Sequence, residues 1–313
     1  MSTPIMLELG LVGLGRMGGN MARRLARARV RVVGHDATPG AAAALAADGT
    51  IQAAATLDDL VRSLATPRLV WVMVPSGEAT QATLDALAGS LSAGDTIVDG
   101  GNANYKDSQR RGRELAERGI GFVDCGVSGG VWGLDNGYAL MFGAEPAGAR
   151  AIEPYARILA PARDRGWLHC GPVGSGHFVK MIHNGIEYGM MQAYAEGFAL
   201  MEGKREFTLD LARVAETWRH GSVVRSWLLD LTADFLAHDA GLDAIAPHVA
   251  DSGEGRWTVA EAVEQGVPAP VLSLALMTRF ASQGRGDTAN RLLARMRQAF
   301  GGHAVRATQD EGR

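Results

Sequence analysis

Residues Met6-Leu-Glu-Leu-Gly-Leu-Val-Gly-Leu-Gly-Arg-Met-Gly18 join a strand-like apolar run to the pattern Gly-x-Gly-x-x-Gly, and helical periodicity follows through Ala28. A strand, this glycine pattern and a helix in that order are typical of a dinucleotide-binding turn. Gly13 suits the tight turn, Gly15 lets the backbone approach a pyrophosphate, and Gly18 permits the helix to pack on the strand. Amide groups at the helix N-terminus would bind the phosphates. The segment therefore predicts a Rossmann-type domain.

Asp36 follows a second strand-like segment, 30–34. It lies about 20 residues past the glycines, where an acidic residue can bond the ribose 2′-hydroxyl of NAD. Its charge would repel the 2′-phosphate of NADP, and Ala37 offers no arginine to attract one. We therefore expect NAD as cofactor, with NADP less favoured. The alternative is that Asp36 only caps the next helix.

Further strand-like segments alternate with helical ones. The strands are expected near Ile51 and at 69–74, 96–99 and 122–125, with helices at 41–47, 57–64 and 106–118. This alternation predicts a parallel, doubly wound α/β sheet. Ligands of such sheets bind beyond the carboxyl ends of the strands, so the loops at Pro75, Asn102 and 127–130 can border the cofactor. Ser128-Gly-Gly130 could hold a carboxylate with its backbone amides, or be a plain flexible turn.

The pattern changes near residue 170. Strand-like segments at 138–142 and 167–170 extend the sheet edge, and only helical periodicity follows. Helices are expected at 209–219, 224–237, 259–264, 271–282 and 288–300. We predict a dinucleotide-binding domain at 1–170 and an all-α domain at 171–313, used for substrate binding and oligomerisation and built on one long helix.

That long helix begins within Gly171-Pro-Val-Gly-Ser-Gly-His-Phe-Val-Lys-Met-Ile-His-Asn-Gly-Ile-Glu-Tyr-Gly-Met-Met191. Its polar side chains recur at i, i+3, i+4, i+7 and i+8, positions that share one helix face: Lys180, His183, Asn184, Glu187 and Tyr188. A solvated face is the alternative, but His, Asn and Tyr are mediocre helix formers. Gly176, Gly185 and Gly189 are expected where other segments pack closely against the backbone.

Composition limits the classes of protein. The chain has 313 residues, enough for two domains, with 47% hydrophobic and 21% charged residues. A net charge of −3 offers no overall attraction to nucleic acid or anionic membrane. No apolar run has the length of a membrane span, and we expect a cytoplasmic protein. The spacing of Cys125 and Cys170 fits neither a disulfide framework nor a metal site. Each is expected to be a small, buried hydrophobic residue.

With these motifs in view, the sequence resembles the 6-phosphogluconate dehydrogenases, within the β-hydroxyacid dehydrogenase superfamily. Two motifs are superfamily signatures: Gly171-Pro-Val-Gly-Ser-Gly176 with Lys180 and Asn184, and Asp124-Cys-Gly-Val-Ser-Gly-Gly130. Three narrower motifs indicate the family: Asp99-Gly-Gly-Asn-Ala-Asn-Tyr105, His183-Asn-Gly-Ile-Glu-Tyr188 and Gly253-Glu-Gly-Arg-Trp-Thr258. The resemblance extends to Phe300-Gly-Gly-His303, and the length is similar to the short, bacterial-type branch.

The resemblance implies a role for each matching residue. Lys180 would be the base and Glu187 the acid. The sugar acid would be held by Asn102, Ser128, Gly129, Gly130, His183 and Asn184. Its phosphate would be held by Tyr188, Arg256, Arg279, Arg297 and His303. The cofactor would be held by Gly13, Leu14, Gly15, Arg16, Met17, Gly18, Asp36, Val74, Pro75, Ser76 and Asn102. A homodimer or homotetramer is also implied.

Two positions depart from the family pattern. Arg256 stands where the long enzymes usually have lysine, and either cation can bind phosphate. Asp36-Ala37 stands where NADP-dependent relatives carry an Asn-Arg pair, which agrees with the physical argument for NAD.

The residue types suit an oxidative decarboxylation. Lys180, with its pKa lowered by burial and neighbouring cations, would take the proton of the substrate's 3-hydroxyl as hydride leaves for the nicotinamide. The resulting β-keto acid can lose carbon dioxide while protonated Lys180 polarises its carbonyl, so we expect no metal. Glu187 would then protonate the enediol to give ribulose 5-phosphate. Lys180 and Glu187 lie about 10 Å apart along the helix axis.

Two other functions stay open at this point. A dehydrogenase or reductase of a small 3-hydroxy acid, such as hydroxyisobutyrate or tartronate semialdehyde, would need no phosphate-binding cations. A module that senses NAD without turnover would have no use for the acid–base pair Lys180 and Glu187.

Overall fold

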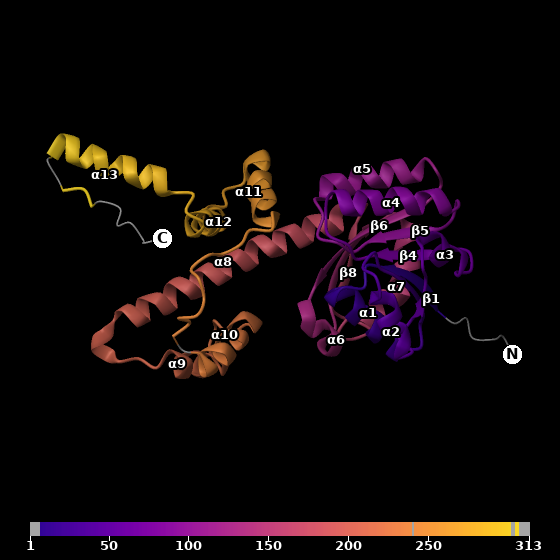
Figure 1. Ribbon diagram of the computed structural model, residues 1–313, viewed down its shortest axis with the longest axis horizontal. Helices are drawn as coiled ribbons and strands as arrows, with labels where there is room; N and C mark the ends of the chain where they lie inside the picture. The colour runs from indigo at the N-terminus through magenta and orange to yellow at the C-terminus, as the bar shows by residue number, and fades with distance from the viewer. Residues whose placement is uncertain (1–6, 240, 302–303, 307–313) are drawn as a thin grey trace. The chain divides into compact units, whose positions relative to one another are not determined.

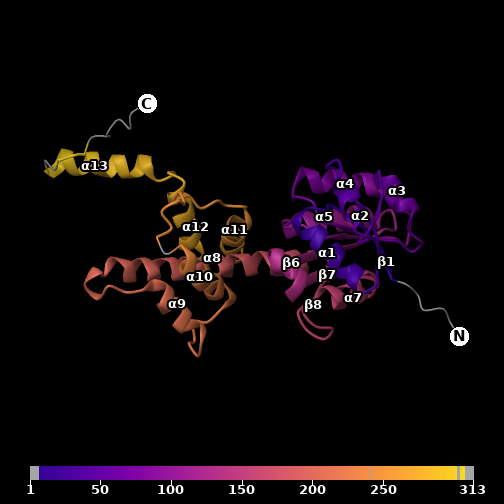
Figure 2. The same ribbon diagram turned by 60° about the horizontal axis from the view of Figure 1, so that its bottom comes forward.

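The computed structural model describes residues 7–239, 241–301 and 304–306. The chain divides into two compact units, Met1–Ile182 and His183–Arg313. A single long helix, α8 (Ser175–Gly203), begins in the first unit and continues into the second. Figure 2 shows α8 as one unbroken rod of helix, as its apolar periodicity predicts.

The first unit is built on one eight-stranded sheet. Its strands lie in the order β3-β2-β1-β4-β5-β6-β7-β8. Their bounds are β1 (Glu8–Val12), β2 (Arg31–His35), β3 (Gln52–Ala53), β4 (Leu69–Val72), β5 (Thr96–Asp99), β6 (Gly121–Ser128), β7 (Ala139–Ala144) and β8 (Trp167–Gly171). The reversal of strand order at β1 and β4 is the point at which doubly wound sheets bind ligands. The predicted Rossmann-type architecture is therefore confirmed.

Helices cover both faces of this sheet (Figure 1). One face packs on α1 (Arg16–Arg27), α2 (Ala41–Ala47) and α7 (Pro146–Leu159), with Met21, Leu45 and Ile152 buried between the layers. The other face packs on α3 (Leu57–Arg62), α4 (Glu78–Ser90) and α5 (Tyr105–Ala116), with Leu60 and Leu84 among the buried residues. Two apolar layers thus hold the strands rigidly, and only the loops beyond their ends are left for ligands.

The strands predicted to be parallel, β1 to β6, are parallel, and the edge of the sheet adds one antiparallel pair. β6 and β7 are antiparallel, with Ser128 opposite Ala139 and Val123 opposite Ala144. Residues 129–138 connect them through the 3-10 helix η1 (Gly130–Trp132) and the short α6 (Gly133–Asn136). A parallel crossover needs a dozen or more residues, so this connection can only return antiparallel.

Besides the short α6, two helices in the described part of the first unit were not predicted from the sequence. α4 has only a weak contrast between its faces, and alanine and threonine fill six of its 13 positions. α7 carries Pro154 in its interior, a residue that normally argues against a helix.

The second unit is helical apart from loops in its described part. After α8 come η2 (Arg205–Phe207), α9 (Leu211–Arg219), α10 (Trp227–His238), α11 (Glu254–Gln265), α12 (Pro270–Ser282) and α13 (Asp287–Gly301). Ala215, Leu229 and Leu236 form a core between α9 and α10. Leu276 of α12 packs with Tyr188 of α8 in a second core. None of the helices that the described residues form has the length and apolarity of a membrane span.

Gly176, Gly185 and Gly189 of α8 lie at close contacts, as predicted. A Cβ on Gly176 would be 2.4 Å from the carbonyl oxygen of Asp124, and one on Gly185 would be 2.6 Å from the Thr258 side chain. Gly189 faces Leu272 at 3.2 Å. These contacts explain why the helix tolerates residues of low helix propensity.

The two cysteines differ. Cys125 is fully buried in the first core, as predicted, and burial raises the pKa of its thiol. Cys170 on β8 is only half-buried, so the prediction of a buried residue was wrong there. β8 lies at the edge of the sheet, where one side has no neighbouring strand.

Candidate active site

The glycine turn between β1 and α1 has the geometry that a pyrophosphate needs. Gly13 has φ +88°, and a Cβ there would be 2.5 Å from the carbonyl oxygen of Met73. A Cβ on Gly18 would be 1.9 Å from the carbonyl oxygen of Gly13. A Cβ on Gly15 would meet nothing within 4 Å, so the space above this residue is open at the start of α1. Gly13 and Gly18 are thus required by packing, and Gly15 leaves room for a ligand.

Asp36 lies directly after β2 and is tied to the glycine turn. Its Oδ2 accepts a hydrogen bond from the backbone N–H of Leu14 at 2.6 Å, and its Oδ1 accepts one from Thr38 at 2.7 Å. Partial burial alone would raise the pKa of Asp36, but these hydrogen bonds outweigh it and hold the pKa below its usual value. Asp36 does not cap α2, whose N-cap is Gly40.

Two further loops leave the same sheet edge after β4 and β5. The first contains Val74, Pro75 and Ser76, and the hydroxyl of Thr80 in α4 donates to the carbonyl oxygen of Pro75 at 2.9 Å. The second contains Asn102, which is half-buried. The structure therefore brings the predicted cofactor residues of the first unit to one edge of one sheet.

Ser128, Gly129 and Gly130 form the turn at the carboxyl end of β6. Gly129 has φ +134° and Gly130 has φ +53°, backbone conformations that favour glycine. Ser128 and Gly129 are half-buried. This turn leads directly into η1 and lies at the same sheet edge as Asn102.

The start of α8 is held by a buried carboxylate on β6. Oδ1 of Asp124 accepts the N–H of Gly174 at 2.6 Å, and Oδ2 accepts the N–H of His177 at 2.7 Å. A negative group at a helix N-terminus is favourable, because the amides there lack intrahelical partners. Burial nevertheless raises the pKa of Asp124 above its usual value, against the opposing effects of His177 and these amides. Asp124 thus acts as a helix cap from another element.

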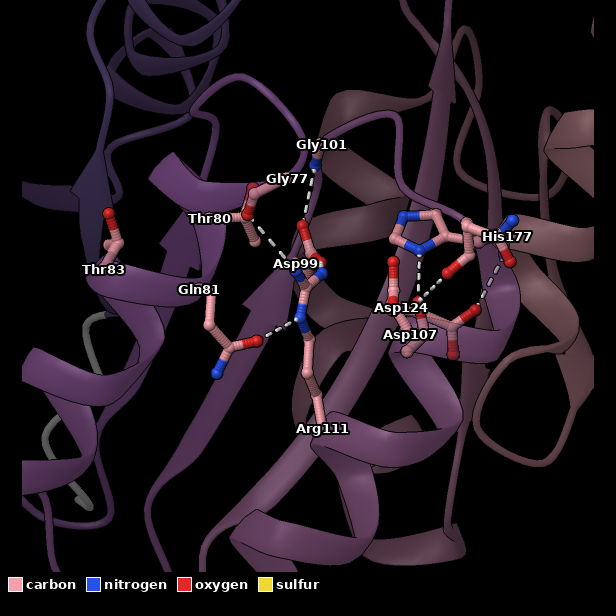
Figure 3. Close-up of polar contacts among 12 residues, drawn as sticks. Gly77, Thr80, Gln81, Thr83, Asp99, Gly101, Asp107, Arg111, Asp124 and His177 are labelled. Atoms are coloured by element: carbon pink, nitrogen blue, oxygen red, sulfur yellow. Dashed lines mark hydrogen bonds and ion pairs between the residues drawn. The ribbon is translucent and has the colours of Figure 1, made fainter. Parts of the chain in front are cut away.

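The imidazole of His177 joins this cap to α5. Its Nδ1 lies 2.7 Å from the hydroxyl of Ser108, and both residues are almost fully buried (Figure 3). The ring of Phe178 contacts that of Tyr105 edge to face at 5.3 Å between centroids. α5 starts just after the Asn102 loop, so these contacts relate the first turn of α8 to that loop.

Lys180 lies one turn further along α8 and is 7% exposed. Its Cβ and Cγ pack on Gly126 of β6, where an added Cβ would be only 2.3 Å from the lysine Cβ. The absence of a side chain at Gly126 therefore decides how close the lysine comes to β6, the strand that ends in Ser128.

The other predicted residues of α8 lie in the second unit. Asn184 is buried, and its Oδ1 is 3.2 Å from Nδ1 of His183. The same nitrogen lies 3.9 Å from Oε2 of Glu187, whose side chain is 41% exposed. Glu187 follows Lys180 by seven residues, so the two lie on the same face of the helix two turns apart.

Tyr188 and Arg279 are in direct contact. The guanidinium of Arg279 lies 3.4 Å from the centroid of the Tyr188 ring, a cation–π geometry. A Cβ on Gly255 would be 2.6 Å from the other side of this ring system, so the tyrosine is tightly enclosed. The tyrosine hydroxyl is 3.4 Å from Oγ of Ser252.

Arg256 has an acidic partner that sequence reasoning missed. Its Nε donates to Oδ2 of Asp251, whose side chain is 5% exposed. Burial alone would raise the pKa of Asp251, but the hydrogen bond from Arg256 and its charge lower it. Arg279 also lowers the pKa of Asp251 through its charge. Arg256 and Arg279, two of the predicted phosphate ligands, therefore both favour the ionised form of Asp251, and Arg256 also bonds to it.

Arg297 and His303 are the other two cations among the predicted phosphate ligands. Arg297 is exposed on α13, and His303 lies outside the described residues. In the part of the chain that the structure describes, no three His, Cys, Asp or Glu residues gather as potential metal ligands.

Sequence reasoning also missed residues that support the site from behind. Asp124 and His177 lie within sequence motifs of the candidate site. Only their contacts show that Asp124 caps α8 and that His177 joins this cap to α5. Arg111 of α5 forms a buried ion pair with Asp99 and was given no role. An arginine in a charged helix gives no sequence signal that it is buried. The acidic residue of the Asp-Gly-Gly-Asn motif does suggest that a basic partner lies nearby.

The fold and these residues together define a class of protein. A doubly wound sheet, a glycine turn at its switch point and a carboxylate after the second strand are the parts of an NAD-binding dehydrogenase. Lys180, which is buried on α8, lies three residues before the helical second unit begins at His183.

Comparison with known proteins specifies the family. Residues 8–163 match the NAD binding domain of 6-phosphogluconate dehydrogenase, and residues 176–292 match the C-terminal domain of the same enzyme. The chain belongs to the 6-phosphogluconate dehydrogenase family. It is 42% identical over 305 residues to an NAD(+)-dependent, decarboxylating 6-phosphogluconate dehydrogenase of Haloferax volcanii, covering 97% of this chain and 100% of the relative.

Longer relatives match over part of their length. An NAD(+)-dependent enzyme of Bacillus subtilis is 35% identical over 291 residues, which cover 88% of this chain and 61% of the relative. The structure of Plasmodium falciparum 6-phosphogluconate dehydrogenase superposes with a TM-score of 0.81 at 28% identity, covering 97% of this chain and 67% of that one. A 3-hydroxyisobutyrate dehydrogenase of Salmonella typhimurium shares the fold, with a TM-score of 0.74 at 22% identity over 90% of this chain and 95% of that one.

Proposed function

We propose that the chain catalyses the oxidative decarboxylation of 6-phospho-D-gluconate to ribulose 5-phosphate and carbon dioxide, with NAD as the hydride acceptor. One observation carries the proposal: Lys180 is buried against Gly126, and Glu187 follows two turns later on the same face of α8. An amine and a carboxyl group so spaced can serve a six-carbon acid that lies along the helix.

The residues of the first unit fit a dinucleotide. The open space above Gly15 at the N-terminus of α1 suits a pyrophosphate, and the lowered pKa of Asp36 keeps its carboxylate ionised for a ribose hydroxyl. Each oxygen of Asp36 has a lone pair left after its backbone bond. When bound, NAD supplies the acceptor for the hydride.

Lys180 is the general base of the proposed reaction. Its amine takes the proton of the substrate's 3-hydroxyl during oxidation. The protonated amine then hydrogen-bonds to the new 3-carbonyl and stabilises the negative charge that develops there as the carboxyl carbon leaves. Packing of its stem on Gly126 limits the positions that the amine can take.

Glu187 is the general acid. Its side chain is 41% exposed and can reach a ligand without a change in the helix. After the Lys180 ammonium has given its proton to the enolate oxygen, Glu187 delivers a proton to the carbon that has lost carbon dioxide and the amine takes the hydroxyl proton back, which turns the enediol into the ketose. His183, 3.9 Å from Oε2 of Glu187, can hold the carboxyl group in place.

Binding groups divide between the two ends of the substrate. Asn102, Ser128, Gly129, Gly130, His183 and Asn184 would hold the hydroxyl and carboxyl groups. Tyr188, Arg256, Arg279, Arg297 and His303 would hold the phosphate. The Asp251 partner of Arg256 keeps this cation in place without a ligand, and a phosphate would compete with that carboxylate for the guanidinium.

We also propose that the chain works as a homodimer or homotetramer in the cytoplasm. Residues 1–170 would form the dinucleotide-binding domain, and residues 171–313 the substrate and oligomerisation domain. Apolar side chains are exposed on α8, α12 and α13: Leu200 by 76%, Leu274 by 66% and Leu293 by 59%. Exposed apolar surface of this kind marks protein–protein contacts. The free thiols of Cys125 and Cys170 suit a reducing compartment.

The test is a spectrophotometric assay with 6-phosphogluconate and NAD, with trapping of the released carbon dioxide. Reduced cofactor and carbon dioxide should appear in equal amounts, and unphosphorylated gluconate should react poorly because it lacks the group that the arginines bind. Lys180→Met should lower kcat by roughly 1,000-fold with little change in the Kd for NAD, since a general base commonly contributes 100- to 10,000-fold.

Glu187→Gln separates the second role. It should slow formation of ribulose 5-phosphate more than it changes the KM for 6-phosphogluconate. Residual turnover of Lys180→Met above a few per cent of wild type would remove the lysine from its role. A Glu187→Gln enzyme that changed only in affinity would make Glu187 a binding group.

A further inference from the structure

A buried ion pair lies behind the two loops that follow β4 and β5. The side chain of Arg111 on α5 is 3% exposed and that of Asp99, the last residue of β5, is 0% exposed. The NH1 nitrogen of Arg111 donates to Oδ2 of Asp99 at 3.2 Å. Figure 3 shows the guanidinium between Asp99, Gln81 and Gly77. This ion pair is called the loop brace below.

Each end of the loop brace is attached to a different loop. Oδ1 of Asp99 accepts the backbone N–H of Gly101 at 3.1 Å, one residue before Asn102. Nε of Arg111 donates to Oε1 of Gln81, in the first turn of α4, at 3.0 Å. NH2 of Arg111 faces the carbonyl oxygen of Gly77 at 3.5 Å, a long contact. The brace therefore connects the start of α4 with the loop that carries Asn102.

The two loops also touch each other directly. A Cβ on Gly101 would be 3.1 Å from the carbonyl oxygen of Val74 and 3.2 Å from Oδ1 of Asp99. The Val74 loop is held from its other side by the hydrogen bond of Thr80 to Pro75. Movement of either loop would thus disturb both partners of the brace.

The same strands carry a matched ion pair at their opposite ends. Arg68, just before β4, donates from NH1 to Oδ2 of Asp95, just before β5, at 3.0 Å. The side chains are 19% and 2% exposed. Asp95 also accepts the N–H groups of Arg68 and Ser92 at 2.7 and 2.9 Å. This pair lies at the amino ends of the strands, and ligands of such sheets bind beyond the carboxyl ends.

We propose that Arg111 and Asp99 are positioning residues that set the separation of the 74–77 and 100–102 loops and so the place of Asn102 in the cofactor site. The inference rests on the proposed function, because that function puts Val74, Pro75, Ser76 and Asn102 at the cofactor. Both brace side chains are buried at 3% and 0% exposure, so they act through the loops and offer no surface to a ligand. A buried ion pair is by itself weak evidence of a stabilising role, whereas a forked arginine that connects two loops is suited to hold a geometry.

The experiment compares Arg111→Lys with Arg68→Lys. Lysine keeps the charge but cannot bond Asp99 and Gln81 together with one planar fork. Thermal unfolding, the Kd for NAD by calorimetry, and kcat with KM are measured for both. We expect both variants to lose thermal stability. Only Arg111→Lys should weaken NAD binding and lower kcat, each roughly ten-fold, because a small misplacement of a positioning group has large effects.

A milder variant keeps the test decisive if Arg111→Lys does not fold. Gln81→Met retains the ion pair of Arg111 with Asp99 and removes the bonds of Gln81 to Arg111, Arg110 and Asp85, so it should fold and still weaken NAD binding several-fold. Wild-type Kd and kcat in a folded Arg111→Lys, or an equal loss in Arg68→Lys, would overturn the proposal. If Arg111→Lys does not fold, a wild-type Kd in Gln81→Met would do the same.

The measurement of NAD binding needs no sugar acid. A wild-type protein that binds NAD but does not oxidise 6-phosphogluconate would contradict the proposed function and leave the comparison of Arg111 with Arg68 valid. A wild-type enzyme with the expected activity, whose two lysine variants behave alike, would contradict the loop brace alone.

Discussion

Asp36 shows how a single side chain can combine a structural and a recognition role. Its carboxylate receives the amides of Leu14 and Thr38, and these bonds keep its pKa low although part of the group is buried. The carboxylate is therefore charged at neutral pH. It can accept a hydrogen bond from a ribose hydroxyl, and it repels a 2′-phosphate. The cofactor preference follows from this residue and from the neutral Ala37 beside it.

The double variant Asp36→Asn with Ala37→Arg should reverse the preference. Removal of the negative charge and addition of a guanidinium favour the 2′-phosphate. We expect the ratio of kcat/KM for NAD to that for NADP to fall on the order of 100-fold, which corresponds to about 2.7 kcal/mol. Steady-state kinetics with both cofactors measure this ratio. Asp36→Asn alone is the control, and it should weaken NAD without creating good use of NADP; an unchanged ratio in the double variant speaks against Asp36 as the selector.

Glycines that contact other segments are a second feature at the scale of single residues. Gly126 and Gly176 lie where β6 and α8 approach most closely, and a side chain at either would displace the lysine or the strand. Gly197 of the same helix meets nothing within 4 Å. Close packing therefore explains Gly176 of α8 but not Gly197. The spacing of the glycines in the sequence does not distinguish the two cases.

At the scale of elements, α8 is the component that relates the proposed base to the sheet. Its first turn is capped by Asp124 from β6 and joined to α5 through His177 and Ser108. Its periodicity then places Lys180 and Glu187 on one face. A long helix is stiff, so its anchorage at one end determines where the lysine lies relative to Ser128.

Asp124→Asn should reveal the cost of the buried charge in that cap. The amide keeps one acceptor oxygen and leaves one backbone N–H without a partner, which costs about 1–3 kcal/mol in free energy of unfolding. The native pKa of Asp124 is raised above its ordinary value of 3.8. Its contribution to stability is therefore complete below that value and is lost as the pH rises through the native pKa.

Urea unfolding of wild type and Asp124→Asn at several pH values tests this sign. The difference in free energy of unfolding between the two should be largest at or below about pH 3.8, the ordinary pKa, and shrink as the pH rises through the raised native pKa of Asp124. Asp95→Asn is the matched control, because hydrogen bonds lower the pKa of Asp95 in spite of its burial. Its difference should grow as the pH rises to about 3.8 and then stay constant, and a constant difference for Asp124→Asn would contradict the raised pKa.

At the scale of the whole molecule, the two units have different kinds of surface. The first unit buries its apolar residues in two layers against one sheet. The second leaves large apolar side chains of α8, α12 and α13 exposed. A helical unit with so much exposed apolar surface is expected to pack against a second copy.

Leu274→Glu combined with Leu293→Glu should therefore weaken self-association. The wild type should sediment as a dimer or larger, and the variant should shift towards monomer at micromolar concentration, because two charges would be buried in the contact. Leu168→Glu, on the edge strand of the first unit and 60% exposed, is the control. Equal sedimentation of all three proteins would mean that the contact between copies lies elsewhere on the chain. A monomeric wild type would exclude such a contact.

Much of this protein could be predicted from local pattern. The sheet, the long helix and the all-helical second unit follow from periodicity and from the glycine turn, because each depends on residues close in sequence. α4 and α7 were missed since one has little contrast between its faces and the other contains Pro154. The parallel sheet was confirmed for β1 to β6, and the orientation of β7, which was not predicted, follows from the short connection before it.

The sequence predicted which residues belong to the candidate site better than it predicted the contacts between them. The spacing of Lys180, Glu187 and Tyr188 is a property of one helix, so the sequence was sufficient to group them. The pairing of Arg256 with Asp251 and the stacking of Arg279 on Tyr188 depend on how helices dock. Their sequence contains no periodic signal for these contacts.

By itself, therefore, the sequence determined the fold class, the dinucleotide turn and the face of α8 that carries the amine and the carboxyl group, because these are short-range properties of the backbone. Only the tertiary structure decided that Asp124 caps a helix that begins some 50 positions later and that Arg111 connects two loops through Asp99. Such contacts join segments that are distant along the chain. Their geometry is set by how strands and helices pack, and no local pattern of residues encodes it.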